Sequence, residues 1–140
     1  MSCEKIRRIA SQTLRALGLR SGVLSVLLVG DRKMQSLNRR YLQHDRPTDV
    51  IAFGGLLDSG RLEATQGRPY LGDIVISVDT ARRQARSYGN SFSYELMFYL
   101  CHGILHLRGY RDKTVKGASA MEGKQKTLLK KIGIKNTPSR

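Results

Sequence analysis

The spacing of hydrophobic residues predicts that helices and short strands alternate along the chain. A first helix is predicted from Glu4 to Leu17, because six residues share one helical face: Ile6, Ile9, Ala10, Thr13, Leu14 and Leu17. The run from Val23 to Val29 is almost entirely apolar, which predicts a strand buried on both faces. A second helix is predicted from Arg32 to Leu42, with Met34, Leu37 and Tyr41 at helical spacing.

The second half of the chain continues this pattern. Strands are predicted from Asp49 to Phe53 and from Leu71 to Val78, and the glycine-rich stretch from Gly54 to Arg68 indicates a loop or a loose hairpin. Three further helices are predicted: Asp79 to Tyr88 with Asp79 as N-cap, Ser91 to Leu107, and a basic helix from Ala118 to Ile132. We therefore expect a single α+β domain over residues 1–140, in which a small mixed sheet of about four strands packs against helices.

The charge of the chain is strongly positive and favours a polyanionic partner. Lys and Arg number 25 against 11 Asp and Glu, which gives a formal net charge of +14. Residues 1–20 carry +4 and residues 111–140 carry +7, whereas residues 51–80 carry −2. Such a distribution favours a basic face for nucleic acid over a uniformly basic soluble domain, which is the alternative. No apolar run approaches the roughly 18 residues needed to cross a bilayer, so no membrane partner is expected.

The two cysteines indicate a reducing compartment. Cys3 and Cys101 have no spacing typical of a disulfide framework or a zinc knuckle, and Cys101 lies in an apolar stretch that favours a buried structural thiol. The first residues also lack the apolar segment of a secretory signal. We expect a cytoplasmic protein.

Two of the three histidines, His102 and His106, have the spacing of metal ligands. Residues four apart on a helix are separated by about 40° of rotation and about 6 Å of rise, so both imidazoles project from one face. Gly109 then allows the chain to turn, and Asp112 follows as a third donor in the pattern His-x3-His-x2-Gly-x2-Asp. A histidine pair alone is more often a core or surface feature, but the glycine and the third donor favour a metal site.

The same histidine spacing occurs in zinc proteases of the metzincin type. Those enzymes need Glu directly after the first His as a general base, and Gly103 occupies that position. The metal site is compatible with this residue, whereas the peptidase reaction is not.

Three blocks of sequence resemble the YbeY family of bacterial metal-dependent endoribonucleases, which act in ribosomal RNA maturation. His102-Gly-Ile-Leu-His106-Leu-Arg-Gly-Tyr110 is similar to the family signature His-Gly-x-Leu-His-Leu-x-Gly-Tyr-Asp-His. Leu37-Asn38 with the run Pro47 to Phe53, and Leu71 to Ser77, match two more family blocks, and Met121-Glu122 matches a pair in its last helix. The resemblance covers residues 24–132 and implies a zincin-like metal-binding helix.

Two positions depart from the family pattern. The third ligand of the family is His, where this chain has Asp112; a carboxylate is an acceptable zinc ligand, but it should alter metal affinity or preference. The family's Arg after the tyrosine, which faces the substrate phosphate, is replaced by Leu42. Arg39, Arg40 and Arg46 are near in sequence and are candidates to compensate.

The resemblance leads to a specific hypothesis for the reaction. In this hypothesis His102, His106 and Asp112 hold one divalent metal, taken as Zn²⁺. The water that the metal activates hydrolyses a phosphodiester bond of single-stranded RNA. No general base is identified beyond that water, with Arg46 as a supporting group. RNA contacts are assigned to Arg39, Arg40, Arg46 and Lys124, and the expected partner is ribosomal RNA or the small ribosomal subunit, in rRNA maturation and ribosome quality control.

Other readings stay open for several residues. Asp49, Asp73 and Thr48 suit capping or hydrogen bonding as well as catalysis, and His44 suits a solvated loop. Tyr94, Phe98 and Tyr99 favour core packing over base stacking. The alternative function is a non-enzymatic RNA-binding ribosome assembly factor that keeps the metal for structure, which the replacement at Leu42 favours.

Overall fold

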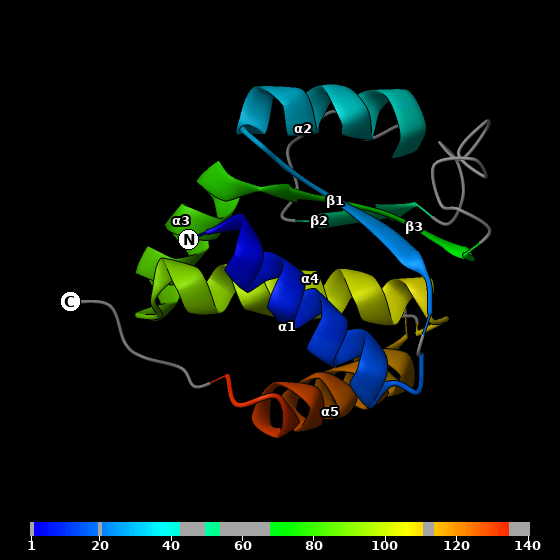
Figure 1. The fold of residues 1–140 in the computed structure, drawn as a ribbon. Helices are drawn as coiled ribbons and strands as arrows, with labels where there is room; N and C mark the ends of the chain where they lie inside the picture. Colours follow the sequence, from blue (N-terminus) through cyan, green and yellow to red (C-terminus); the bar gives the residue numbers. More distant parts are fainter. Residues whose placement is uncertain (1, 20, 43–49, 54–67, 111–113, 135–140) are drawn as a thin grey trace.

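A mixed sheet of three strands lies between helices on both of its faces (Figure 1). The computed structural model describes residues 2–19, 21–42, 50–53, 68–110 and 114–134. Strand β3 (Tyr70–Ser77) is central, with β1 (Val23–Val29) parallel on one side and β2 (Val50–Phe53) antiparallel on the other. The expected α+β class is therefore confirmed. The described residues contain three strands where about four were expected, and the loop or hairpin predicted over residues 54–67 lies outside them.

The alternating side chains of β3 build a core on each face of the sheet. Ile74 and Ile76 pack against α1 (Cys3–Ala16) and α4 (Phe92–Leu107), whereas Val75 packs with Met34 of α2 (Asp31–Leu37) on the opposite face. A further helix, α5 (Val115–Lys131), lies against α4 on the side away from the sheet, and α3 (Val78–Tyr88) follows β3 directly (Figure 1). Because α4 contacts the sheet, α1, α3 and α5, it is the central helix of the molecule.

The prediction that residues 23–29 are buried on both faces is wrong. Leu27 and Leu28 are 50% and 38% exposed, because β1 is an edge strand in the order β1-β3-β2. The two-sided burial belongs to β3, from Gly72 to Ser77. The apolar run predicted the strand correctly but not its place in the sheet.

The helix predicted from Arg32 to Leu42 is present, but it is not a uniform α-helix. An α-helix from Asp31 to Leu37 continues as a π-helical turn, Asn38–Leu42. The other helices agree with their predicted ranges to within three residues at each end. No helix in the described ranges has the combination of length and apolarity that a membrane-spanning segment needs.

The prediction that Asp79 caps α3 is also wrong. The N-cap is Ser77, whose hydroxyl accepts the Thr80 N–H at 3.2 Å. Asp79 instead accepts the backbone N–H of Asp31 at 2.8 Å, at the start of α2. The Asp31 carboxylate in turn accepts hydrogen bonds from Ser77 and Thr80, each at 2.8 Å, and from Arg83. This network joins the carboxyl ends of the two parallel strands.

Candidate metal centre

The last two turns of α4 bring His102 and His106 together. Ser91 caps the helix by accepting the Tyr94 N–H at 3.1 Å, and buried Leu105 and Ile104 fix its C-terminal half in the core. Both imidazoles are half-buried, and their Nε2 atoms are 3.1 Å apart. The ring planes meet at 78°, with centroids separated by 4.6 Å. The predicted shared face of the two histidines is therefore present.

The hydrogen-bond partners determine which nitrogen of each ring carries the proton. The side-chain amide of Gln125 donates to the Phe98 carbonyl at 2.7 Å, which turns its oxygen toward Nδ1 of His102 at 3.3 Å. Nδ1 of His106 lies 3.1 Å from the Tyr110 carbonyl. Because both partners are acceptors, the Nδ1 atoms are the donors in these two contacts, and the Nε2 atoms of the two rings face each other.

The two Nε2 atoms lie at hydrogen-bond distance, 3.1 Å, so they are close enough to share a proton or to bind one ion together. Two nitrogens at about 2.1 Å from one ion are about 3.4 Å apart in tetrahedral geometry and about 3.0 Å apart at a right angle. The observed separation falls in this interval. In metal sites the histidine nitrogen that does not bind the metal commonly donates to an acceptor, as Nδ1 does here toward Gln125 and the Tyr110 carbonyl. The histidine pair therefore fits a transition metal.

The turn at Gly109 places one of those acceptors. Gly109 has φ +99°, and the N–H groups of Gly109 and Tyr110 donate to the carbonyls of His106 and Leu105 at 3.0 and 3.1 Å. This is a Schellman ending, in which the left-handed residue reverses the chain. The reversal brings the Tyr110 carbonyl back to His106, so the glycine predicted to end the helix also orients a ligand.

The third predicted ligand, Asp112, lies outside the described residues, as do Arg46, His44, Thr48 and Asp49. Within the described ranges, no group of three His, Cys, Asp or Glu side chains forms a metal site. The two imidazoles are thus the described part of the predicted centre, and the assignment of Asp112 stays a prediction.

Gly103 has a packing role that its position in the motif did not indicate. A Cβ at this residue would lie 2.9 Å from Cγ2 of Ile74, which is fully buried in β3. Only glycine lets α4 approach the sheet this closely, and this approach sets the height of the neighbouring His102 above β3.

The predicted RNA-binding residues that the structure describes, Arg39, Arg40 and Lys124, do not gather in one place. Arg39 and Arg40 are exposed on the turn that follows α2, on the face of the sheet opposite to α4. Lys124 is half-buried on α5, next to Gln125.

Asp73 is 4% exposed and accepts a hydrogen bond from the Tyr70 hydroxyl, which agrees with a structural role. Cys101 is buried as expected, and burial raises the pKa of its thiol while a hydrogen bond with Thr13 lowers it.

Gln125 is the site residue that sequence reasoning missed. It is 2% exposed and lies in the buried stripe Met121, Gln125, Leu128 of α5. An uncharged polar residue in an otherwise apolar stripe was the available signal, because a buried amide needs hydrogen-bond partners.

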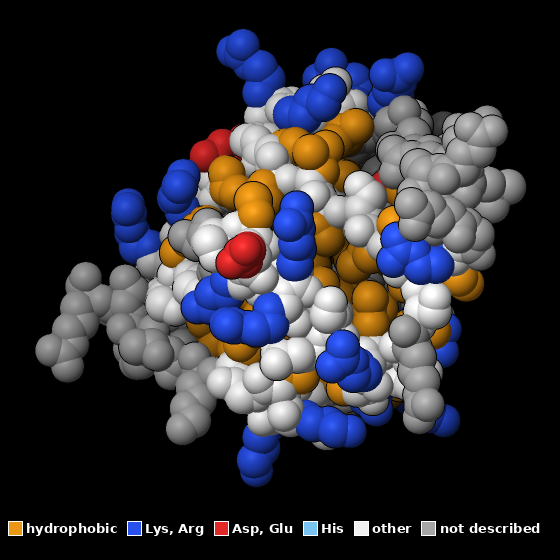
Figure 2. Space-filling view, viewed as in Figure 1, with side chains coloured by type: hydrophobic (Ala, Val, Ile, Leu, Met, Phe, Trp, Pro, Cys, Tyr) orange, Lys and Arg blue, Asp and Glu red, His pale blue; other side chains and the backbone are white. Residues whose placement is uncertain are grey.

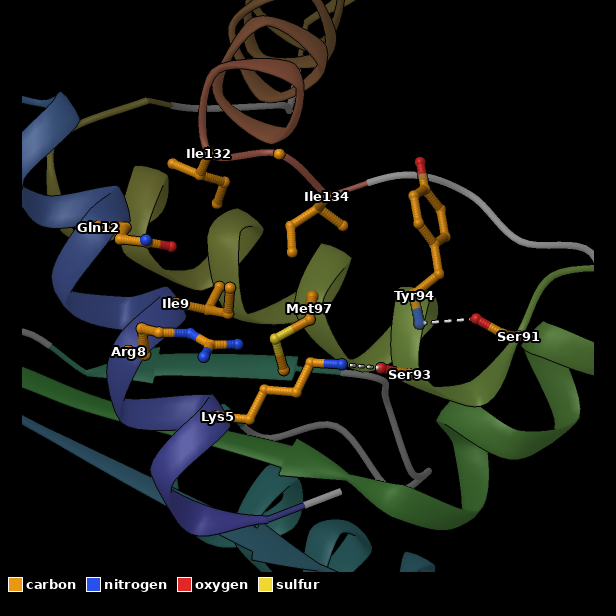
Figure 3. Close-up of a pocket in the computed structure, with 11 residues that line it drawn as sticks. Lys5, Arg8, Ile9, Gln12, Ser91, Ser93, Tyr94, Met97, Ile132 and Ile134 are labelled. Atoms are coloured by element: carbon orange, nitrogen blue, oxygen red, sulfur yellow. Dashed lines mark hydrogen bonds between the residues drawn. The ribbon is translucent and has the colours of Figure 1, made fainter.

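A large cavity of the molecule is separate from the histidine pair. It has a volume of about 680 Å³ and lies between α1, the start of α4 and residues 132–134 (Figure 3). Lys5, Arg8 and Tyr94 are among its lining residues, and neither His102 nor His106 is. We therefore do not assign the metal chemistry to this cavity.

Comparison with known proteins matches the fold and the motif together. The family model described as Endoribonuclease YbeY matches residues 2–133. The chain belongs to the YbeY family. A relative named Endoribonuclease YbeY from Moorella thermoacetica is 40% identical over 94% of this chain and 90% of the relative. Another YbeY relative, from Geobacter metallireducens, is 41% identical over 89% of this chain and 83% of its own length.

A solved structure has the same fold. The solution structure of TM1509 from Thermotoga maritima superposes with a TM-score of 0.61, at 25% identity, over 92% of this chain and 79% of that one. The resemblance stated from the sequence blocks is therefore confirmed at the level of the family.

Proposed function

We propose that this chain is an endoribonuclease that hydrolyses RNA phosphodiester bonds with one divalent metal ion, Zn²⁺, bound by His102, His106 and Asp112. The observation that carries the proposal is the convergence of two Nε2 atoms 3.1 Å apart, on rings that are each oriented by an acceptor at Nδ1. The endoribonuclease activity rests on the named relatives. Like the metal-binding helix of zincins, α4 supplies two ligands from consecutive turns, but Gly103 replaces their glutamate.

Each side chain has a definable task in this site. His102 and His106 bind through Nε2, while Gln125 and the Tyr110 carbonyl hold their rings in orientation. A bound divalent ion supplies Lewis-acid chemistry, lowering the pKa of water and offsetting charge on the phosphoryl oxygens. Asp112 adds an anionic oxygen, which partly neutralises the ion and distinguishes this donor set from the three-histidine set that the family resemblance implies.

The surface charge supports an RNA substrate. Figure 2 shows Lys and Arg side chains spread over α1, α2 and α5 with few acidic side chains between them. Several described acids are also neutralised or buried, since Asp31 pairs with Arg83, Glu122 pairs with Lys126, and Glu95 is 4% exposed. Among the described residues Arg39 and Arg40 are exposed, and we propose Arg39, Arg40, Arg46 and Lys124 as the phosphate contacts.

We place this activity in the maturation and quality control of ribosomal RNA, in the cytoplasm, with ribosomal RNA or the small ribosomal subunit as partner. The absence of a disulfide spacing and the net charge of +14 support this setting.

The test is cleavage of structured ribosomal RNA by the purified chain, with and without a chelator, and by His106→Ala. We expect cleavage to depend on the metal and to be lost in His106→Ala, together with stoichiometric zinc. Cys3→Ser is the matched control, because it removes an exposed metal-ligating side chain outside the proposed site, and it should keep both zinc and activity. RNA binding without any metal- or His106-dependent cleavage would instead identify an assembly factor.

A further inference from the structure

A second cavity, of about 390 Å³, lies between α3 and α4 and has an aromatic lining. Four aromatic rings line it, those of Tyr88, Tyr94, Phe98 and Tyr99. The polar side chains of Asn90 and Glu95 form much of the remaining wall. We call these residues the aromatic pocket. Its volume is within the range of sites that hold small ligands.

The aromatic pocket lies on the same face of α4 as the histidine pair. Phe98 precedes His102 by four residues and Glu95 precedes it by seven, the spacing at which helical side chains share a face. One turn of helix, about 6 Å, separates Phe98 from His102. Gln125 contacts both the Phe98 carbonyl and His102, so it connects the helical turn that carries the pocket to the turn that carries the first histidine. A ligand in the pocket would therefore be adjacent to the candidate metal centre.

Part of the aromatic surface that lines the pocket is not buried in the hydrophobic core. Core packing was expected for Tyr94, Phe98 and Tyr99; Tyr99 is part of the core at 5% exposure, and Phe98 packs against the core with part of its ring exposed. Tyr94 and Phe98 are half-buried, and Tyr88 is 70% exposed. The Tyr94 and Phe98 rings are 6.2 Å apart and tilted by 34°, while Phe98 meets Tyr99 edge to face. Aromatic surface held in fixed orientation beside a cavity is suited to stacking against another ring.

One polar group of the pocket, the Glu95 carboxylate, acts purely as an acceptor of hydrogen bonds. The Asn90 amide donates to Glu95 Oε1 at 2.5 Å and so fixes the carboxylate in place. Burial raises the pKa of the Tyr94 hydroxyl, and the charge of Glu95 adds to this rise while Lys126 opposes it. Lys126, whose charge acts on this edge of the pocket, is itself paired with Glu122 at 3.1 Å.

We propose that the aromatic pocket is a nucleobase subsite, which holds one amino-bearing base of an RNA substrate beside the phosphodiester at the histidine pair. The rings stack on the base, and the Glu95 carboxylate accepts from an exocyclic amino group, as carboxylates do from cytosine. Uracil has no amino group and fits less well. This inference rests on the proposed function, because it assigns the base next to the bond that is cut.

The first test is binding of single nucleotides to His106→Ala, which removes cleavage. Cytidine 5′-monophosphate should shift the NMR signals of Tyr94, Phe98 and Glu95, and uridine 5′-monophosphate should bind several-fold more weakly. Tyr94→Leu and Tyr88→Ser should each weaken cytidine 5′-monophosphate binding, by about tenfold for Tyr94→Leu. Tyr88 is 70% exposed, so its replacement leaves folding intact. Phe92→Leu is the matched control, because Phe92 lies on the same helix but stacks under Arg82 and does not line the pocket.

The second test is the base preference around the cut sites in an RNA of random sequence. We expect one position at a fixed distance from the cut to favour amino-bearing bases, and Tyr94→Leu or Glu95→Gln to weaken this preference while cleavage persists. Cleavage without a positional preference, or nucleotide binding that leaves the pocket signals unshifted, would overturn the subsite. If the wild type cuts no RNA, the proposed function fails, and the nucleotide shifts alone decide whether the pocket binds a base.

Discussion

Replacing Gln125 by Leu removes the contact that orients His102. The Gln125 amide is 2% exposed and links two groups, accepting from His102 Nδ1 and donating to the Phe98 carbonyl at 2.7 Å. Without it, the imidazole is free to rotate or to take the other tautomer, which puts its proton on Nε2. Loss of such an outer contact costs about 10- to 100-fold in metal affinity. This corresponds to about 1.4–2.7 kcal/mol of binding free energy.

The same substitution should destabilise the metal-free protein. The Phe98 carbonyl keeps its donor within α4, so the cost is that of the lost hydrogen bonds, about 0.5–1.5 kcal/mol each, and leucine restores neither of them. The two effects are separable, because zinc affinity is measured by competition with a chromophoric chelator and stability by urea unfolding in excess chelator. We expect both to fall in Gln125→Leu.

The control is Gln12→Leu, the same chemical change on α1, where the side chain lines the large cavity and is half-buried. It should leave zinc affinity unchanged. If Gln125→Leu loses stability but binds zinc as tightly as the wild type, Gln125 only supports packing, and the tautomer argument for the metal centre is wrong.

Two further predictions concern the scaffold. Gly103→Ala should lower the free energy of unfolding by about 1–3 kcal/mol, because the added Cβ meets Ile74 at 2.9 Å. Gly123→Ala in α5, where an added Cβ has no atom within 4 Å, should instead raise it by about 0.5–1 kcal/mol. Equal effects of the two variants in urea unfolding would contradict the close approach of α4 to the sheet. The hydrogen bond from Arg83 lowers the pKa of Asp31 below its usual 3.8, and bonds from Ser77 and Thr80 add to this against a rise from burial. The ionised Asp31 carboxylate therefore stabilises the fold above about pH 4, and this stabilisation is lost as the pH falls through the lowered pKa of the folded state. In Asp31→Asn the free energy of unfolding should fall less steeply than in the wild type as the pH is lowered from about 5 to 2. The same pH dependence in both proteins would refute this.

The order of helices and strands was readable from the sequence, but the neighbours of each strand were not. Hydrophobic periodicity reports how side chains alternate within a segment, so the strand at Val23–Val29 was placed without error at both ends. It contains no information on which strand lies beside it. The exposed side of Leu27 follows from pairing with β3 alone, a contact between residues far apart in sequence.

Local signals also failed where a tertiary contact decided between two candidates. Both Ser77 and Asp79 are good N-cap residues by type. Ser77 caps α3, because Asp79 is engaged by the N–H of Asp31 in another helix. A sequence window around α3 does not contain that competitor, so the choice was not predictable from it.

The candidate site divides along the same line. His102 and His106 were predictable because one helix carries both, and helical geometry alone fixes their relation. Gln125 lies 23 residues from His102 on a different helix, and the Tyr110 carbonyl is a backbone group with no side-chain signature. The ligands of this site are therefore visible in the sequence, whereas the groups that orient them become visible only in the fold.

The two orienting contacts come from different parts of the structure, and this has an energetic consequence. His106 is held by the turn at Gly109, which is local to α4, whereas His102 is held by α5, which must dock before the contact exists. Metal binding should therefore be coupled to the docking of α5 through the contact between His102 and Gln125. A ligand that binds the docked state stabilises it by mass action, so zinc should protect the amides of α5 from hydrogen exchange. In Gln125→Leu this protection should decrease, because the contact between α5 and His102 is then lost.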